Sequence, residues 1–211
     1  MRRIHLATKN EGKIKEMKAL LQDLDIELLT PEAAGSFPEV IEDGRTFLEN
    51  ALKKAQNLSE ATGGETLADD SGLEVDALGG KPGIFSSRYS GPGSTDETNI
   101  RKLLEDLMGM PDERRSARFR CVVVLYRPGG DHEVFEGTLE GRITTEPAGW
   151  NGFGYDPVFF VPEFNMTVAQ MSSEMKNRIS HRGQALRLLK KSLQMKESRE
   201  KNSPAGRSAA W

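Results

Sequence analysis

The apolar run at residues 119–127 constrains the fold of this chain more than any other segment. It contains three consecutive valines, and the turn residues Pro128-Gly129-Gly130 follow it directly. At this length it is strand-sized, far below the length of a membrane helix. A second extended stretch follows at 134–137. Because two such runs around a short glycine-containing turn are typical of a β-hairpin, we predict a hairpin whose first strand is central and buried.

The start of the chain has the pattern of a strand, a tight turn and a helix. Residues 4–8 form the predicted strand, and residues 10–12 are polar turn formers. Apolar residues then recur at helical spacing, at Ile14, Met17, Leu21 and Leu24. Helical and extended patterns alternate along the whole chain, so we predict an α/β fold with a mixed β-sheet flanked by helices.

Capping residues and helix breakers delimit the other elements. Thr46 with Glu49 three residues later is the pattern of a capping box, and Gly63-Gly64 ends the helix that it opens. Further helices are predicted after Thr95 and Ser180, and further strands at 66–68, 139–145 and 158–161. Residues 79–93 are rich in glycine, proline and serine, and a loop of this length is usually functional.

The end of the chain differs in composition from the rest. From Lys196 onward it is rich in glutamate, lysine and serine, and it contains Pro204-Ala205-Gly206. We therefore predict a disordered tail at 196–211 after a single folded unit at 1–195. With 211 residues, that unit has room for one large domain or for two small lobes that share a cleft.

Charge and cysteine content narrow the class of protein. The single cysteine, Cys121, excludes an internal disulfide, and the first residues lack the apolar run of a signal peptide. We therefore expect a cytoplasmic protein. The net charge of −3 argues against a broad surface for nucleic acid, and no apolar stretch is long enough for a membrane. A few clustered lysines could still bind one small anion.

The turn after the first strand has the features of a phosphate site. The sequence Thr8-Lys9-Asn10-Glu11-Gly12-Lys13 lies where a strand passes into a helix. Backbone N–H groups at a helix N-terminus favour an anion, and Thr8, Asn10 and Lys13 would add hydrogen bonds and a full charge. The turn has no Walker-loop pattern, and ordinary turn chemistry before a helix is the alternative.

Two acidic segments could hold a metal ion. Asp69-Asp70-Ser71-Gly72 follows the predicted strand at 66–68, and Glu42-Asp43-Gly44 precedes the helix with Lys53 and Lys54. Magnesium prefers one or two carboxylates completed by waters and substrate phosphates. The alternatives are an Asx-turn that closes the strand and a solvated acidic loop.

Two further segments suggest recognition of a nucleobase. In Gly152-Phe153-Gly154-Tyr155-Asp156-Pro157, aromatic residues lie among glycines, where a ring could stack on a base or fold back onto the core; we expect one of the two rings to fold back. After Lys176, the final helix opens with Ser180-His181-Arg182. Ser180 is a plausible cap, but cations in a first helical turn oppose the helix dipole. A polar ligand bound by both would explain that arrangement.

Taken together, these motifs resemble the inosine/xanthosine triphosphate pyrophosphatase family in order and spacing. The resemblance runs from about residue 3 to about residue 193 and includes the stretch at 82–91, where Phe85 occupies a position that is commonly tyrosine. It implies an elongated two-lobed fold around a mixed sheet, a central substrate cleft and a homodimer.

The resemblance also implies roles for particular residues. Asp70 would be the general base and, with Glu42, a ligand of Mg²⁺. The triphosphate would be held by Thr8, Asn10, Lys13, Lys54 and Ser71. Phe153 would stack on the base, and its polar edge would be surrounded by Gly154, Tyr155, Asp156, Lys176, His181 and Arg182. Lys54 is preferred to Lys53 because it directly precedes Ala55, as in the family pattern.

The expected reaction is hydrolysis of ITP, dITP or XTP to the monophosphate and pyrophosphate. Donors from His181 and Arg182 would pair with a 6-keto oxygen and face a 6-amino group unfavourably. Two other functions remain open: a pyrophosphatase for other modified nucleotides on a related fold, and a nucleotide sensor without turnover. A scaffold role leaves the clustered polar loops unexplained.

Overall fold

A seven-stranded mixed sheet forms the centre of the molecule, described by a computed structural model for residues 1–31 and 40–202. The strand order is β2 (Ile26–Leu29), β1 (Arg2–Leu6), β3 (Glu65–Val75), β4 (Ser116–Tyr126), β5 (His132–Ile143), β6 (Phe159–Val161) and β7 (Met166–Thr167). β1 is parallel to β2 and β3, and the remaining pairs are antiparallel. The predicted mixed α/β fold is thus confirmed, with β4 in the middle of the sheet.

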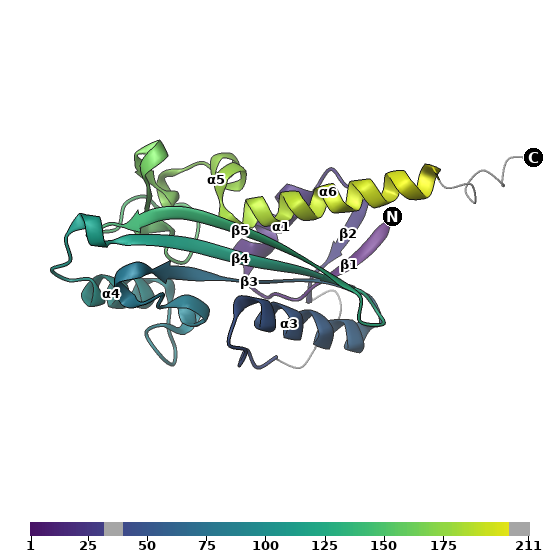
Figure 1. Ribbon diagram of the computed structural model, residues 1–211, viewed down its shortest axis with the longest axis horizontal. Coiled ribbons are helices and arrows are strands. Elements are labelled where there is room, and N and C mark those ends of the chain that lie inside the picture. The colour runs from purple at the N-terminus through teal and green to yellow at the C-terminus, as the bar shows by residue number, and fades with distance from the viewer. Residues whose placement is uncertain (32–39, 203–211) are drawn as a thin grey trace, which may run out of the picture.

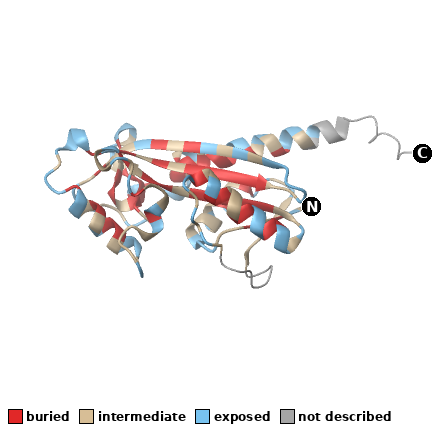
Figure 2. Cartoon of the chain, turned by 60° about the horizontal axis from the view of Figure 1, so that its bottom comes forward, coloured by how far each residue is buried: buried red, intermediate tan, exposed pale blue. Residues whose placement is uncertain are grey.

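Helices cover both faces of one half of this sheet. α1 (Glu11–Leu21) and α6 (His181–Asn202) pack on one face around Met17, Leu67 and Leu186, and α3 (Phe47–Thr62) packs on the other around Ala51 and Val124. Figure 1 shows the long strands β3, β4 and β5 running the length of the molecule, with α3 below them and α6 above. Figure 2 shows the buried residues gathered along the strands and on the inner sides of these helices.

The other half of the sheet has its own core. There, α4 (Asp96–Asp106) packs beside the segment at Gly83–Arg88 and α5 (Ser173–Ile179) beside α6, and buried residues such as Leu73, Phe119 and Phe159 pack together. Ala68 and Leu73 of β3 belong to the core clusters of different halves. The residues of β3 between them are mostly polar. The molecule therefore has two lobes joined by the long strands (Figure 1), and the polar residues Asp69, Asp70 and Ser71 of β3 lie between the two cores.

The structure corrects the predicted position of the acidic pair. Asp69 and Asp70 lie in the middle of the eleven-residue strand β3, paired in register with Val123 and Val122, and not in a turn at a strand end. The Asx-turn alternative is also wrong. Local turn propensity is outweighed here by hydrogen bonding to β4 along the whole length of β3.

Other boundaries differ in smaller ways. The stretches predicted at 134–137 and 139–145 form the single strand β5, and the predicted loop at 79–93 contains a 3₁₀ helix at Gly83–Arg88. Thr46 caps α3 by accepting from the Glu49 N–H, but the Glu49 carboxylate accepts from the Arg45 N–H, so the capping box is only half formed.

The predicted tail is partly helical. α6 continues to Asn202, seven residues past the predicted boundary, and the rest of the predicted tail lies outside the described residues. Within residues 1–31 and 40–202, no helix has both the length and the hydropathy needed to cross a membrane.

Candidate active site

The carboxyl end of β1 marks the point where the sheet opens. β1 pairs with β3 only as far as Leu6 and Leu67. Beyond Leu67, this edge of β3 pairs, within the described residues, only through an isolated bridge between Glu74 and Pro82. The chain leaves β1 through α1 on one face and returns to β3 through α3 on the other. Ligands of α/β sheets bind where connections diverge in this way, and a cleft of about 400 Å³ opens here.

Consecutive residues of β3 place two carboxylates on opposite faces of the sheet. Asp69 pairs with Val123, which belongs to the core under α1 and α6, and Asp70 pairs with Val122, which belongs to the core under α3. Because side chains alternate along a strand, Asp69 faces α1 and α6 while Asp70 faces α3. The cleft at the open edge of β3 is therefore lined from both faces.

The turn before α1 has the local structure predicted for it. Asn10 caps α1 by accepting from the Lys13 N–H at 3.0 Å, and Thr8 accepts from the Asn10 N–H at 3.2 Å. The Lys13 ammonium lies 3.0 Å from the Asp69 carboxylate and is mostly buried. The helix N-terminus and a lysine therefore border the cleft together, which is a favourable environment for an anion.

On the α3 face, a lysine lies between two carboxylates. The Lys54 Nζ is 3.0 Å from the Asp70 Oδ1 and 3.0 Å from the Glu42 Oε1, and the Asn50 amide donates to the other Asp70 oxygen. Lys53, in contrast, is at the surface and pairs with Asp43. The preference for Lys54 as a cleft residue therefore agrees with the geometry.

Burial raises the pKa of Asp70, and the nearby Lys54 opposes that rise only in part. A carboxylate with a raised pKa is a better proton acceptor than an ordinary aspartate. For Lys54, burial lowers the pKa, but Asp70, Asp69 and Glu42 outweigh it and the net pKa is raised. The lysine therefore stays charged beside the carboxylate.

Glu42 and Asp70 also suit a divalent cation. Their oxygens converge on one ammonium group, so both face a common cation position, and the two negative charges exceed the single charge of Lys54. Among the described residues, no group of three or more metal-ligating side chains forms a ready-made site. Two hard carboxylates with room for phosphate and water ligands are the pattern of Mg²⁺.

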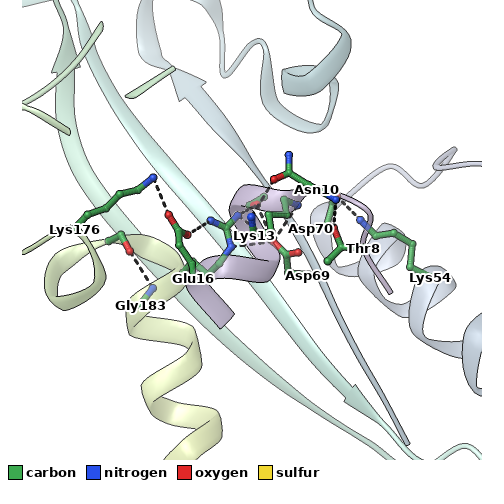
Figure 3. A network of polar contacts seen from close by, with 12 residues as sticks. Thr8, Asn10, Lys13, Glu16, Lys54, Asp69, Asp70, Lys176 and Gly183 are labelled. Carbon is green, nitrogen blue, oxygen red and sulfur yellow. Dashed lines mark hydrogen bonds and ion pairs between the residues drawn. The ribbon is translucent and has the colours of Figure 1, made fainter. Parts of the chain in front are cut away.

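A chain of buried charges of alternating sign lies on the other face. In order of contact it consists of Lys13, Asp69, Arg182, Glu16, Lys176 and Asp156. Figure 3 shows Glu16 next to Lys176 and Asp69 close to Lys13. Burial would raise the pKa of Asp69 and of Glu16, but their cationic neighbours hold both below the usual range. This series of charges is neutral overall, because its three cations alternate with three anions.

The glycine-flanked aromatic loop divides its two rings between different environments. Tyr155 is buried in the core of the second lobe, where its hydroxyl donates to the Ser86 carbonyl at 2.8 Å. Phe153 lies in the cleft, with the Lys176 ammonium 4.4 Å and the Arg182 guanidinium 5.5 Å from its ring centre. The expectation that one of the rings folds back onto the core holds for Tyr155.

The structure explains the cations at the start of α6 differently from the sequence prediction. Arg182 is 2% exposed and donates to Asp69, Glu16 and Ser71, so buried protein groups stabilise its charge. Burial, Arg182 and Lys176 lower the pKa of His181 well below the ordinary value, so this imidazole is neutral. Protein groups therefore account for the charge of Arg182, whereas the buried Nδ1 of His181 has no hydrogen-bond partner among the described residues.

All of the predicted site residues line the same cleft. They come from the segments 8–13, 42–54, 70–71, 153–156 and 176–182, and they are Thr8, Asn10, Lys13, Glu42, Lys54, Asp70, Ser71, Phe153, Gly154, Tyr155, Asp156, Lys176, His181 and Arg182. The Ham1 family model matches residues 4–192.

The chain belongs to the Ham1 family. It is 53% identical over 190 residues to the dITP/XTP pyrophosphatase of Geobacter sulfurreducens, covering 90% of this chain and 96% of that protein. The dITP/XTP pyrophosphatase of Escherichia coli K12 is 48% identical over 191 residues, with the same coverage of each. The structure of a HAM1 protein from Coxiella burnetii matches with a TM-score of 0.85 at 45% identity, covering 92% of this chain and 100% of that one.

Three cleft-associated residues of this Ham1 chain were missed by the sequence analysis. Glu16 joins Arg182 to Lys176, Asn50 donates to Asp70, and Asp96 accepts from a backbone N–H of the aromatic loop. Glu16 had one available signal, since it follows Lys13 by three residues and so shares its helix face. The contacts of the other two depend on partners far away in sequence.

The close approach of α1 to the aromatic ring yields a testable prediction for the Ham1 cleft. A Cβ atom added at Gly12 would lie 2.5 Å from the Phe153 Cδ1, so the ring must move in Gly12→Ala. We expect KM for ITP to rise about tenfold, with little loss of stability because alanine favours helix by up to ~1 kcal/mol over glycine. Steady-state kinetics and a thermal melt measure both quantities.

The control for this variant is a second substitution at the ring itself. In a Phe153→Leu background there is no ring to displace, so adding Gly12→Ala should change KM by less than about twofold, as expected for two coupled sites. Equal effects of Gly12→Ala in both backgrounds would show that the ring contact is not responsible.

Proposed function

We propose that this chain hydrolyses non-canonical purine nucleoside triphosphates, namely ITP, dITP and XTP, to the monophosphate and pyrophosphate. The observation that carries the proposal is the position of Asp70: its buried carboxylate lies beside Lys54 in a cleft bordered by the helix N-terminus of α1 and by the Phe153 ring. The curated relatives named dITP/XTP pyrophosphatase support dITP and XTP as substrates.

The reaction places three demands on the residues of the cleft. A water must attack the α-phosphorus in line, the bond from the α-phosphorus to the bridging oxygen must break, and the water's proton must leave. Lys13, Lys54 and the N-terminus of α1 would bind the phosphates and stabilise the negative charge of the transition state. The Asp70 carboxylate would orient the water and accept its proton.

Mg²⁺ would be held by Glu42 and Asp70 and would neutralise charge on the phosphates. The remaining ligands would come from water and substrate, which agrees with the preference of Mg²⁺ for few protein carboxylates. Glu42 is also fixed from the second lobe, because the Arg88 guanidinium donates to its carbonyl at 3.1 Å. The protein therefore holds the proposed ligands in place before Mg²⁺ binds.

Base recognition would take place around Phe153. Its ring would stack on the purine, and His181, Lys176 and the remaining donor capacity of Arg182 would face the 6-keto oxygen. Four of the five guanidinium N–H groups of Arg182 already have partners in the described part of the chain, so Arg182 contributes at most one further hydrogen bond. The neutral His181 can donate from one ring nitrogen.

An assay of pyrophosphate release with ITP, XTP, GTP and ATP tests the function directly. We expect kcat/KM for ITP and XTP to exceed that for ATP by about 100-fold or more, since unpaired donors disfavour the 6-amino group. EDTA should abolish release, and added Mg²⁺ should restore it. Tight ITP binding without pyrophosphate release would instead identify a nucleotide sensor, and a preference for pyrimidine triphosphates would identify a related pyrophosphatase. The cytoplasmic location and the homodimer stay predictions from the sequence.

A further inference from the structure

The Phe153 loop has little packing behind it. A second cavity, of about 920 Å³, lies beside the cleft and shares Phe153, Gly154 and Asp96 with it. The loop is therefore a wall between two cavities. Tyr155 packs in the core of the second lobe, but Phe153 and Gly154 border both cavities, so the position of these two residues depends more on specific hydrogen bonds.

Within the loop, one carboxylate shapes the turn. Asp156 accepts from the Phe153 N–H at 2.9 Å and is fixed in turn by the Lys176 ammonium. This contact is internal, because it sets the shape of the loop but does not place the loop relative to the second lobe. Gly154 has a positive φ of 61°, which favours glycine, and its N–H is not used by the loop itself.

The acceptor for that N–H comes from α4. The Asp96 carboxylate accepts from the Gly154 N–H at 2.6 Å, across 58 residues of sequence. Asp96 is the first residue of α4, and a capping box between Thr95 and Thr98 fixes the helix start beside it. The next loop residue, Tyr155, donates to the Ser86 carbonyl in the same lobe. Two consecutive residues after Phe153 are thus tied to the segment at 83–106.

We infer that Asp96 is a positioning residue that sets the place of the Phe153 ring in the cleft and so controls binding of the nucleobase. This inference rests on the proposed function, because it assigns the base to Phe153. Asp96 acts through the Gly154 amide, and in the described structure it makes no hydrogen bond or ion pair with Lys13 or Lys54, which would bind the phosphates. Loss of the contact should weaken base binding and leave phosphate binding unchanged.

The chain offers a closely matched control. Glu97 follows Asp96 in the first turn of α4, is also exposed and acidic, and makes no hydrogen bond to the loop in the described structure. Both residues interact similarly with the helix dipole. The two alanine substitutions therefore differ in that only Asp96→Ala removes the hydrogen bond from the Gly154 N–H. Asp96→Asn removes the charge but keeps an acceptor oxygen for the amide.

The test compares these variants by calorimetry with two probes, inosine monophosphate and inorganic tripolyphosphate. We expect Asp96→Ala to weaken inosine monophosphate binding about tenfold and to raise KM for ITP similarly, because a charge-assisted hydrogen bond is lost. Its kcat and its tripolyphosphate affinity should stay within about twofold of the parent chain. Asp96→Asn should recover most of the binding, and Glu97→Ala should match the parent chain.

Hydrogen exchange supplies a readout that is independent of activity. The amides of 151–157 should exchange faster in Asp96→Ala than in Glu97→Ala. The inference is overturned if Asp96→Ala behaves like Glu97→Ala in binding and exchange, if Asp96→Asn is as impaired as Asp96→Ala, or if tripolyphosphate binding falls equally. If the parent chain releases no pyrophosphate from ITP, the proposed function fails instead, and the exchange comparison still decides whether Asp96 holds the loop.

Discussion

Asp70→Asn is expected to lower kcat for pyrophosphate release from ITP by about 10³-fold, since proton transfer by a positioned group typically contributes 10²- to 10⁴-fold. Asparagine keeps the size of the side chain and an acceptor oxygen, so the strand pairing of β3 with β4 should persist. What it removes is the negative charge between Lys54 and the reacting water. Single-turnover release at saturating ITP measures the chemical step, and a thermal melt checks the fold.

Asp43→Asn is the matched control for this variant. Asp43 lies next to Glu42 but points to Lys53 at the protein surface, with an N–O distance of 2.6 Å. Its substitution removes one acidic charge from the same region without changing the cleft, and kcat should remain within about twofold of the parent chain. If Asp70→Asn retained more than a tenth of the parent kcat, Asp70 would not be the proton acceptor.

The second large effect is structural: Arg182→Ala should lower the free energy of unfolding by about 3–5 kcal/mol. The substitution leaves Asp69 and Glu16 without their shared guanidinium, and Asp69 is fully buried. Each carboxylate keeps one cation, Lys13 beside Asp69 and Lys176 beside Glu16, but the buried charges are left with one excess negative charge, which is strongly destabilising. Urea unfolding measures the change, and the melting temperature should fall by roughly 10 °C for a chain of this size.

Two comparisons make the Arg182 result specific. Arg187→Ala removes an exposed arginine from the same helix, where its guanidinium donates to the Asn177 carbonyl, and should cost less than about 1 kcal/mol. Adding Asp69→Asn to Arg182→Ala should recover part of the loss, because it removes the excess negative charge that Arg182→Ala leaves among the buried groups. A loss below about 1 kcal/mol for Arg182→Ala would mean that the charge chain does not support the fold.

The fold class and most of the cleft could be predicted from the sequence because the relevant signals are local. Apolar periodicity, caps and glycines locate the hairpin, α1 and α3, and the family motifs name residues that the structure brings to one cleft. The Asp69–Asp70 segment was placed wrongly for the same reason. Its residues have high local turn propensity, whereas the strand depends on pairing with β4, about 50 residues away.

The role of Arg182 could not be predicted, because its partners are distant in sequence. Glu16 is 166 residues away and Asp69 is 113 residues away, so nothing near Arg182 indicates that its charge is already balanced. The extent of α6 was missed for a different reason. Glutamate and lysine are good helix formers, so a charged composition at the end of a helix is compatible with continued helix as well as with disorder.

The placement of Asp69 and Asp70 on opposite faces of β3 makes strand register a determinant of chemistry. A shift of one residue between β3 and β4 would turn every side chain of β3 to the other face; in one direction it would place Asp70 where Asp69 lies under Arg182, and Ser71 where Asp70 lies beside Lys54. The position beside Lys54 would then lack the Asp70 carboxylate, and Ser71 and Gly72 would be displaced from the edge of the cleft. A single-residue deletion in β3 is therefore a more severe lesion than most substitutions there, although the carboxylates themselves would remain.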